Sequence, residues 1–130
     1  DNKALKHIAS LGVNIYRTTN IGPYRKQLPL IAQLRATGSC FSTPFITLDD
    51  DVIYPTDIVK RLMTAMEVEE AVVAHRGREL AFRNSDIAPY KDFPVPSLGV
   101  SLMNIGTGKN GIAYRLGHFP AKLEDFVGQG

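Results

Sequence analysis

The chain has 130 residues, 44% of them hydrophobic and 22% charged, which is the composition of an ordinary globular protein of one domain. A formal net charge of +2 without a basic run argues against nucleic acid as a partner, and no apolar run approaches the ~20 residues of a membrane span. There is no signal-peptide pattern, and a single cysteine, Cys40, excludes an internal disulfide. We therefore expect a cytoplasmic protein in which Cys40 is an inert packing residue.

A first helix is predicted between a capping residue, Asp1 or Asn2, and the helix-ending Gly12. Its apolar residues recur with the helical period at Ala4, Leu5, Ile8, Ala9 and Leu11. Residues 13–16 are then predicted to be a strand. Helix, glycine and strand in this order are half of an α/β unit that lacks its preceding strand, and the chain opens without methionine. We therefore expect a fragment or a processed chain.

A second helix is predicted over residues 24–36, with Pro29 confining its regular part to Gln27 onward. Its expected core positions are Leu28, Ile31, Ala32 and Leu34. Arg25 and Lys26 lie near the start of this helix, where positive charge is unfavourable unless an anion is close. Two interpretations stay open for these cations: a phosphate ligand, or solvated surface charge.

The most distinctive stretch is residues 45–55, in which a short apolar run rich in β-formers delivers three consecutive carboxylates to a turn. The run predicts a buried strand that ends just before Asp49, Asp50 and Asp51. In open α/β sheets that end of a strand borders the ligand crevice. Adjacent carboxylates repel one another, and a divalent cation with oxygen ligands, Mg²⁺ or Mn²⁺, relieves the repulsion. A solvated acidic turn is the alternative, although the apolar residues on both sides weaken it.

A third helix and a further strand follow the carboxylates. Thr56 is the predicted N-cap of a helix that runs to about Val68. Its predicted buried stripe consists of Ile58, Val59, Leu62, Met63 and Met66. Residues 70–75 are the next predicted strand, and Arg76 and Arg78 add positive charge at its end. In a parallel sheet these cations come out on the same edge as the carboxylates and suit a phosphorylated ligand, whereas an exposed loop explains them without any function.

The last third of the chain combines a loop with two strands. Residues 84–96 are predicted to be loop, and residues 98–104 and 112–115 to be strands. Between the strands, residues 106–111 match G-x-G-x-x-G by letter, but a dinucleotide-binding loop opens a helix, whereas here a short apolar segment and Gly117 follow. A glycine turn that lets the backbone approach a ligand, or a hairpin-like connection, is therefore the better interpretation.

These motifs together resemble bacterial glycosyltransferases of the GT-A fold, specifically family-2-like enzymes that build capsular or other surface polysaccharides. The resemblance spans residues 22–114 in the order and rough spacing of that family. It is carried by Gly-Pro-Tyr-Arg-Lys at 22–26, Asp-Asp-Asp-Val-Ile-Tyr-Pro at 49–55, Ala-His-Arg at 74–76 with Pro-Tyr at 89–90, and the glycine-rich turn and apolar strand at 106–114. The stretch that looks like the metal-binding D-x-D element is the most specific of the four.

The resemblance implies a metal-dependent transfer of a sugar from a nucleoside-diphosphate donor to an acceptor hydroxyl. Asp51 and Asp49 would bind Mn²⁺ or Mg²⁺, with Asp49 also on the nucleotide and Asp50 assisting on the donor side. The cation would stabilise the charge that develops on the leaving diphosphate. Arg76, and after it Lys26, would add to that stabilisation. The glycine-rich turn would lie on the acceptor side, at Gly106, Thr107 and Gly108.

The expected fold class is therefore α/β, with a GT-A type mixed sheet flanked by helices, in one partial domain over residues 1–130. We expect the central piece of a glycosyltransferase domain, incomplete at both ends. Its general base is expected outside the chain, since Glu124 and Asp125 fit the solvated face of a short helix better. The implied partners are a nucleoside-diphosphate sugar and a glycan acceptor, without nucleic acid. The lack of a membrane span leaves peripheral membrane association open.

Two other function classes compete with this interpretation. An aspartate-nucleophile phosphatase also ends an apolar strand in D-x-D, which Asp49 and Asp51 fit. That class has Thr or Val where this chain has Ile53, and it needs a later Lys and acidic pair that is not evident here. A non-catalytic nucleotide-sugar-binding remnant needs only the fold and the metal site, and it is the serious alternative for this chain taken alone.

Overall fold

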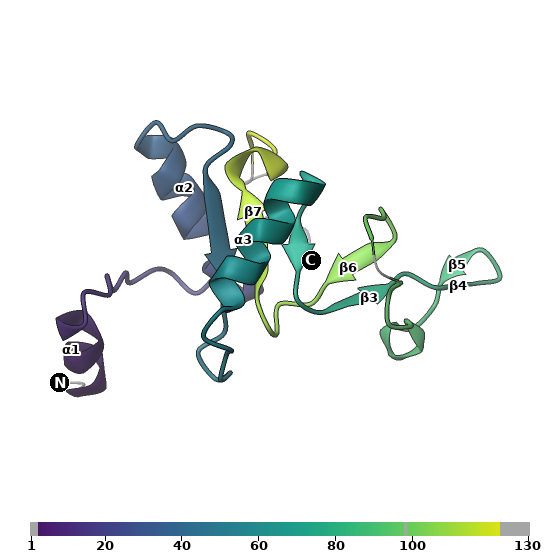
Figure 1. Ribbon diagram of the computed structural model, residues 1–130, viewed down its shortest axis with the longest axis horizontal. Coiled ribbons are helices and arrows are strands. Elements are labelled where there is room, and N and C mark those ends of the chain that lie inside the picture. The colour runs from purple at the N-terminus through teal and green to yellow at the C-terminus, as the bar shows by residue number, and fades with distance from the viewer. Residues whose placement is uncertain (1–2, 98, 123–130) are drawn as a thin grey trace.

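The computed structural model describes residues 3–97 and 99–122 of the chain. The predicted caps Asp1 and Asn2, Leu98 in a predicted strand, and the carboxylates Glu124 and Asp125 lie outside the described residues. Within them the chain is α/β, with helices beside small antiparallel sheets (Figure 1).

Three α-helices and seven strands form the regular structure of the described residues. The helices are α1 (Lys3–Ser10), α2 (Leu28–Ala36) and α3 (Ile58–Glu69). The strands are β1 (Pro44–Thr47), β2 (Val73–Ala74), β3 (Gly77–Glu79), β4 (Phe82–Arg83), β5 (Asp86–Ile87), β6 (Asn104–Gly106) and β7 (Ile112–Arg115). Short 3₁₀ turns lie at Gly22–Lys26, Tyr90–Asp92 and Leu116–His118. None of these helices is both long and apolar enough to span a membrane.

A three-stranded sheet with the order β1-β7-β2 forms the centre of the molecule (Figure 1). β7 pairs antiparallel with both neighbours, and its Ile112 stands between Thr47 of β1 and Ala74 of β2. β1 and β2 therefore run parallel to each other, and their carboxyl ends reach the same edge of the sheet. Among the described strands every hydrogen-bonded pair is antiparallel. In the central sheet this is because β7 is inserted between the two strands that run the same way.

Helices cover both faces of this sheet. Successive side chains of a strand point to opposite faces, and in β7 Ile112 and Tyr114 pack with Ile31 of α2, whereas Ala113 packs against α3. The α3 residues in that second cluster are Ile58, Leu62 and Met66. Because both faces are covered, β7 reads as an apolar run without alternation.

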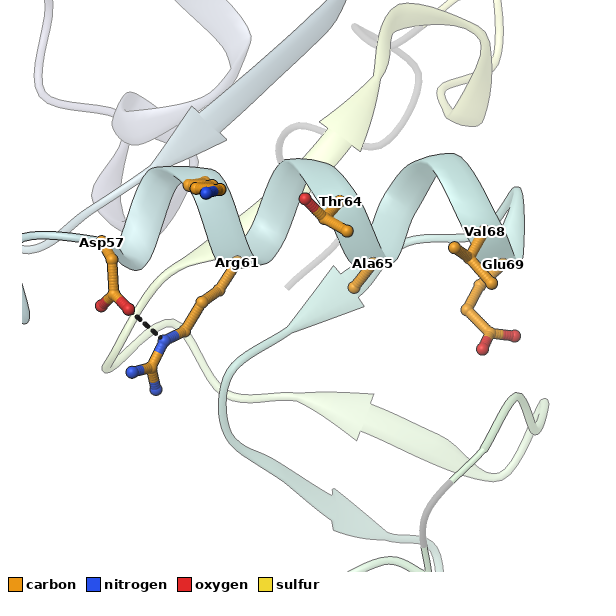
Figure 2. Close-up of a pocket in the computed structure, with 7 residues that line it drawn as sticks. Asp57, Arg61, Thr64, Ala65, Val68 and Glu69 are labelled. Carbon is orange, nitrogen blue, oxygen red and sulfur yellow. Dashed lines mark hydrogen bonds and ion pairs between the residues drawn. The ribbon is translucent and has the colours of Figure 1, made fainter.

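α3 differs from its prediction at its start and along one side. Its N-cap is Asp57 rather than Thr56, and the Asp57 carboxylate accepts a hydrogen bond from the Arg61 Nε at 2.8 Å instead of capping the backbone (Figure 2). Val59, predicted to be buried, is exposed. The outer side of the helix borders an open hollow of about 540 Å³, whose lining residues all belong to α3 or its N-cap (Figure 2). This hollow is a surface feature of one helix and not a site between elements.

An arm leaves the central sheet, and we define it as residues 77–97 and 99–106, which contain β3, β4, β5 and β6. β3 pairs with β6, and β4 and β5 form a hairpin at the far end (Figure 1). The predicted loop over residues 84–96 therefore begins inside a hairpin. Its turn residues Asn84 and Ser85 have φ of 52° and 69°, as the two central residues of a type I′ turn require.

Of the predicted strands, one begins later than expected and another is absent. The strand expected over residues 98–104 begins only at Asn104, whose N–H closes a turn onto the Ser101 carbonyl at 3.2 Å. The strand expected over residues 13–16 is absent, since this segment has no regular structure. A strand needs a neighbour for its N–H and C=O groups, and no described strand pairs with this segment. α1, which precedes it, buries none of its own residues against the described part of the chain.

Besides Val59, two further predicted packing residues are exposed. Ala32 faces solvent beside the fully buried Ile31. Cys40 is also exposed and precedes the amino end of β1. Hydrogen bonds with the Ser42 and Thr43 hydroxyls, at 2.9 and 3.4 Å, lower the pKa of the Cys40 thiol to about 7. Cys40 is thus a surface thiol and not an inert core residue.

Candidate functional site

One edge of the central sheet collects three segments that lie far apart in the sequence. β1 runs on towards Asp49, and β2 runs on into His75 and Arg76. The His75 N–H donates to the Gly111 carbonyl at 3.1 Å, and the N–H and hydroxyl of Thr107 donate to the Arg76 carbonyl at 2.9 and 3.2 Å. We define the carboxylate edge as residues 48–51, 75–76 and 107–111.

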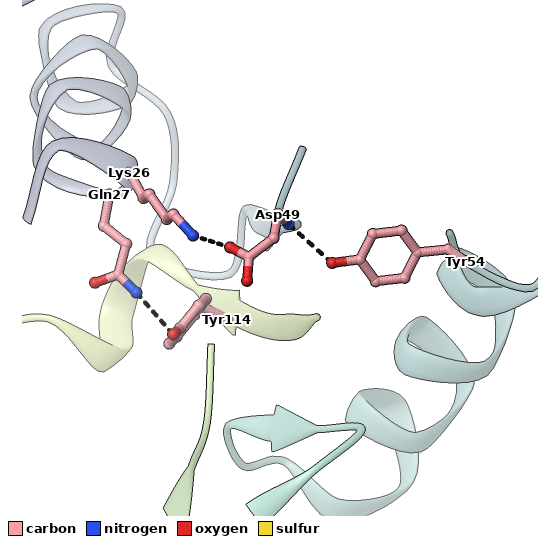
Figure 3. A network of polar contacts seen from close by, with 5 residues as sticks. All are labelled: Lys26, Gln27, Asp49, Tyr54 and Tyr114. Atoms are coloured by element: carbon pink, nitrogen blue, oxygen red, sulfur yellow. Dashed lines mark hydrogen bonds and ion pairs between the residues drawn. The ribbon is translucent and has the colours of Figure 1, made fainter. Parts of the chain in front are cut away.

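Tyr54 holds the acidic turn, which we define as Asp49 to Asp51, in place. The Asp49 N–H donates to the Tyr54 hydroxyl at 2.8 Å, which closes the loop that carries the carboxylates (Figure 3). Tyr54 in turn packs against the cluster formed by α3 and Ala113 of β7. The position of Asp49 is therefore coupled to the hydrophobic core and not only to the end of β1.

Lys26 and Asp49 form an ion pair at this edge (Figure 3). The Asp49 side chain is 16% exposed and that of Lys26 47% exposed, so the carboxylate is the sheltered partner. The Asp49 Oδ1 is shielded from solvent, and the Lys26 ammonium is its charge partner. A sheltered carboxylate needs such a partner because its desolvated charge is costly.

The residue after Lys26 fastens the same segment to the sheet. Gln27 Nε2 donates to the Tyr114 hydroxyl at 2.7 Å (Figure 3). Tyr114 is buried in β7, with its ring stacked on Phe45 of β1 at a centroid distance of 5.2 Å. Burial raises the pKa of Tyr114, against hydrogen bonds from Thr47 and Gln27 that lower it, so the hydroxyl stays protonated at neutral pH. Two polar contacts therefore dock residues 26–27, one onto Asp49 of the carboxylate edge and one onto Tyr114 of β7.

Asp50 and Asp51 differ from Asp49 in being exposed. Among the described residues, neither carboxylate makes a hydrogen bond or ion pair, whereas Asp49 is held from both its backbone and its side chain. The acidic turn thus presents two free carboxylates beside a third that is neutralised by Lys26.

The residues present fit a hard divalent cation, but only as a partial ligand set. Carboxylate oxygens are the ligands that Mg²⁺ and Mn²⁺ prefer. The described residues contain no group of three or more His, Cys, Asp or Glu side chains arranged to hold a metal. Mg²⁺ in phosphate-handling sites is commonly held by one or two carboxylates together with substrate phosphates and water. Asp51 and Asp49 are the residues that could contribute to such a set.

Some of the predicted cations and glycines lie at the carboxylate edge, and the others do not. Arg76 lies at the carboxylate edge and is exposed, whereas Arg78 donates to the Phe93 carbonyl at 3.1 Å within the arm. Gly106 ends β6, where an added Cβ would lie 2.9 Å from the Cβ of Ala74, so close packing accounts for this glycine. Gly108 is exposed with open space around it, and Thr107 supports Arg76. Of the turn residues, Thr107 and Gly108 belong to the edge itself.

Three residues arrange the edge although no site role was predicted for them. Tyr54 acts through a hydrogen bond within its own loop, whereas Gln27 acts through a hydrogen bond to a residue 87 positions away, for which the sequence holds no local signal. Gly111 has φ of +92° and lies close to Leu48 and to Leu62 of α3. The sequence did hold a signal for Gly111, because it is the last glycine of the 106–111 turn and glycine is the residue that most readily adopts a positive φ.

Comparison with known proteins yields no match to a protein-family model, to a curated protein or to a solved structure. The interpretation of the carboxylate edge therefore rests on its own geometry and chemistry.

Proposed function

We propose that the chain carries the metal and donor half of a GT-A type glycosyltransferase site, in which a sugar is transferred from a nucleoside diphosphate to an acceptor hydroxyl during surface glycan synthesis in the cytoplasm. The observation that carries the proposal is the meeting of three segments at one edge. The acidic turn of Asp49 to Asp51, the exposed cation Arg76 and the glycine-rich turn come together through the register of β1, β7 and β2.

The charges at the edge suit a diphosphate ligand. Two exposed carboxylates, Asp50 and Asp51, can attract a divalent cation, while Arg76 and Lys26 offer positive groups to phosphate oxygens. A carboxylate cluster alone would repel a diphosphate, and a cationic cluster alone would repel the metal. The presence of both within one edge favours a ligand that arrives as a metal–diphosphate complex.

The chemistry assigned to these residues is stabilisation of a leaving group. The divalent cation, when bound, supplies Lewis-acid stabilisation of the departing diphosphate. Asp51 and Asp49 hold it at the strand end, and Arg76 neutralises further charge on the phosphates. Tyr54 keeps Asp49 in position through the 2.8 Å hydrogen bond. We assign no general base within the described residues.

The experiment is a calorimetric titration of Mn²⁺ with and without uridine diphosphate. We expect uridine diphosphate to raise the Mn²⁺ affinity about tenfold, a usual size for coupling between two ligands. Asp51→Ala should abolish this coupling. The matched control is Asp86→Ala, which removes an exposed carboxylate of β5 in the arm and should leave it unchanged. Equal coupling in the Asp51→Ala and wild-type proteins would sink the assignment of the acidic turn.

A binding remnant without catalysis is the second candidate. It is favoured by the same observation, because every residue placed at the carboxylate edge binds or positions a ligand and none is assigned to acceptor activation. Donor hydrolysis by this chain separates the two functions, since a remnant binds Mn²⁺ and uridine diphosphate without turnover. Hydrolysis of a generic phosphomonoester by the chain would instead support the phosphatase class.

A further inference from the structure

Lys26 occupies the charge position that a divalent cation at Asp49 would need. Its ammonium is paired with the sheltered Asp49 Oδ1. Two cations a few ångströms apart at one carboxylate repel each other strongly in a partly desolvated site. A metal bound through Asp49 Oδ1 would therefore compete with the Lys26–Asp49 ion pair.

The backbone next to Lys26 is held by its neighbour Gln27, whereas the Lys26 side chain is long and partly exposed. Lys26 ends the 3₁₀ turn Gly22–Lys26, and the following Gln27 is fastened to Tyr114 at 2.7 Å. The Lys26 side chain is about half exposed, and its ammonium sits on a flexible stem of methylene groups with three donors. When Lys26 leaves Asp49, the Gln27–Tyr114 hydrogen bond still fastens the segment to β7, and the Lys26 side chain stays within reach of the carboxylate edge.

We propose that Lys26 is an exchangeable counter-ion: it neutralises Asp49 in the free chain and moves to a phosphate oxygen of the ligand when Asp49 turns to the divalent cation. This inference rests on the proposed function and adds to it a role that a permanent structural ion pair would not have. Lys26 competes with the cation alone and cooperates with the cation and diphosphate together. One side chain therefore makes the site prefer the metal–diphosphate complex over free metal.

Lys26 competes with the free cation and also binds the diphosphate, so Lys26→Gln should change the affinities for Mn²⁺ and for uridine diphosphate in opposite directions. Mn²⁺ alone should bind about threefold more tightly to the variant, because a half-exposed ion pair no longer competes for Asp49. Uridine diphosphate at saturating Mn²⁺ should bind about tenfold more weakly, because a charge-assisted hydrogen bond to phosphate is lost. Lys26→Arg keeps the charge and should show neither the gain for Mn²⁺ nor the full loss for the nucleotide.

The measurement is the Mn²⁺ affinity of each protein, from the electron paramagnetic resonance signal of free Mn²⁺, followed by calorimetry of uridine diphosphate at saturating Mn²⁺. Lys91→Gln, which removes an exposed lysine from the Tyr90–Asp92 turn, is the matched control and should behave as wild type in both assays. Circular dichroism spectra and thermal unfolding establish that all variants are folded.

Each outcome decides one proposal or both. Tighter Mn²⁺ binding with weaker nucleotide binding in Lys26→Gln supports the exchange. Weaker or unchanged Mn²⁺ binding in that variant overturns it, while leaving the proposed function intact if the wild type still binds Mn²⁺ and uridine diphosphate cooperatively. Failure of both wild type and Lys26→Gln to bind Mn²⁺ overturns the exchange and the proposed function together.

Discussion

At the scale of single residues, Asp49 is the most constrained carboxylate of the acidic turn. Its N–H is held by Tyr54, its side chain by Lys26, and both partners are anchored further, Tyr54 in the α3 cluster and Lys26 through the neighbouring Gln27. Asp51, two positions on, is exposed and without such contacts among the described residues. Within one turn, Asp49 is therefore the carboxylate that is held in place, and Asp51 is the carboxylate that is accessible to a ligand.

Tyr54→Phe tests how much the position of the turn matters. The ring keeps its packing, but the Asp49 N–H loses its acceptor, so we expect a loss of about 1 kcal/mol in the free energy of unfolding. Cooperative binding of Mn²⁺ and uridine diphosphate should weaken about fivefold, because the acidic turn is held less firmly. Calorimetry and urea unfolding measure the two effects.

The control for this change is Tyr90→Phe. Tyr90 is exposed in the arm and its ring contacts Phe93. Removing its hydroxyl should therefore change neither the free energy of unfolding nor the cooperative binding of Mn²⁺ and uridine diphosphate. If Tyr54→Phe bound both ligands as tightly as wild type, the hydrogen bond to Asp49 would have no part in ligand binding.

Residue-scale predictions from the sequence succeed where the signal is local. Three consecutive acids after an apolar run identify the turn, and β7 confirms that a strand and not a helix follows the glycine-rich segment. The partners of Asp49 could not be found in this way. Lys26 is 23 positions away along the chain, and only the folded structure makes it the counter-ion of Asp49.

At the scale of elements, Gly111 joins the turn of the carboxylate edge to both β1 and α3. Its φ is +92°, and an added Cβ would lie 2.9 Å from Leu48 Cδ2 and 3.2 Å from Leu62 Cδ1. A side chain here is therefore disfavoured by backbone strain and by close packing. Gly108 in the same turn has neither constraint, since its surroundings are open and its φ is not positive.

This contrast gives a matched pair of substitutions. Gly111→Ala should lower the free energy of unfolding by about 2–4 kcal/mol, from strain and overpacking together. Gly108→Ala should change it by less than about 0.5 kcal/mol, as usual for an unconstrained surface position. Urea unfolding followed by circular dichroism measures both. Similar values for the two variants would mean that the turn does not pack as described.

Elements with strong periodicity were predictable, and those that depend on distant partners were not. α3 is confirmed because its buried residues recur with the helical period, and β7 because a short apolar run suits a strand covered on both faces. α2 is confirmed from Leu28 to Ala36, which is later than its predicted start at residue 24. Residues 13–16 look like a strand, but in the described chain they find no neighbour to pair with. The β4–β5 hairpin carried a usable signal in Asn84, which favours positive φ, but its two-residue strands are too short to stand out.

At the scale of the whole molecule, a layered body carries the site while α1 and the arm extend from it (Figure 1). α2 and α3 cover opposite faces of the β1-β7-β2 sheet, so the body is stabilised by two separate apolar clusters. The apolar strands predict a sheet buried on both faces. The insertion of β7 between β1 and β2 could not be predicted from chain order, yet it is this insertion that brings the acidic turn, Arg76 and the glycine-rich turn to one edge.

Paramagnetic broadening by Mn²⁺ tests most directly whether the carboxylate edge binds a divalent cation together with a nucleoside diphosphate. Backbone amide signals of the 130-residue chain would be recorded with uridine diphosphate and either Mg²⁺ or substoichiometric Mn²⁺. We expect the loss of signal in Mn²⁺ to be confined to residues 48–51, 75–76 and 107–111 with the neighbouring Lys26, while α1 and the β4–β5 hairpin keep theirs. Broadening centred on any other part of the chain, or an absence of selective broadening, would contradict the assignment of the site.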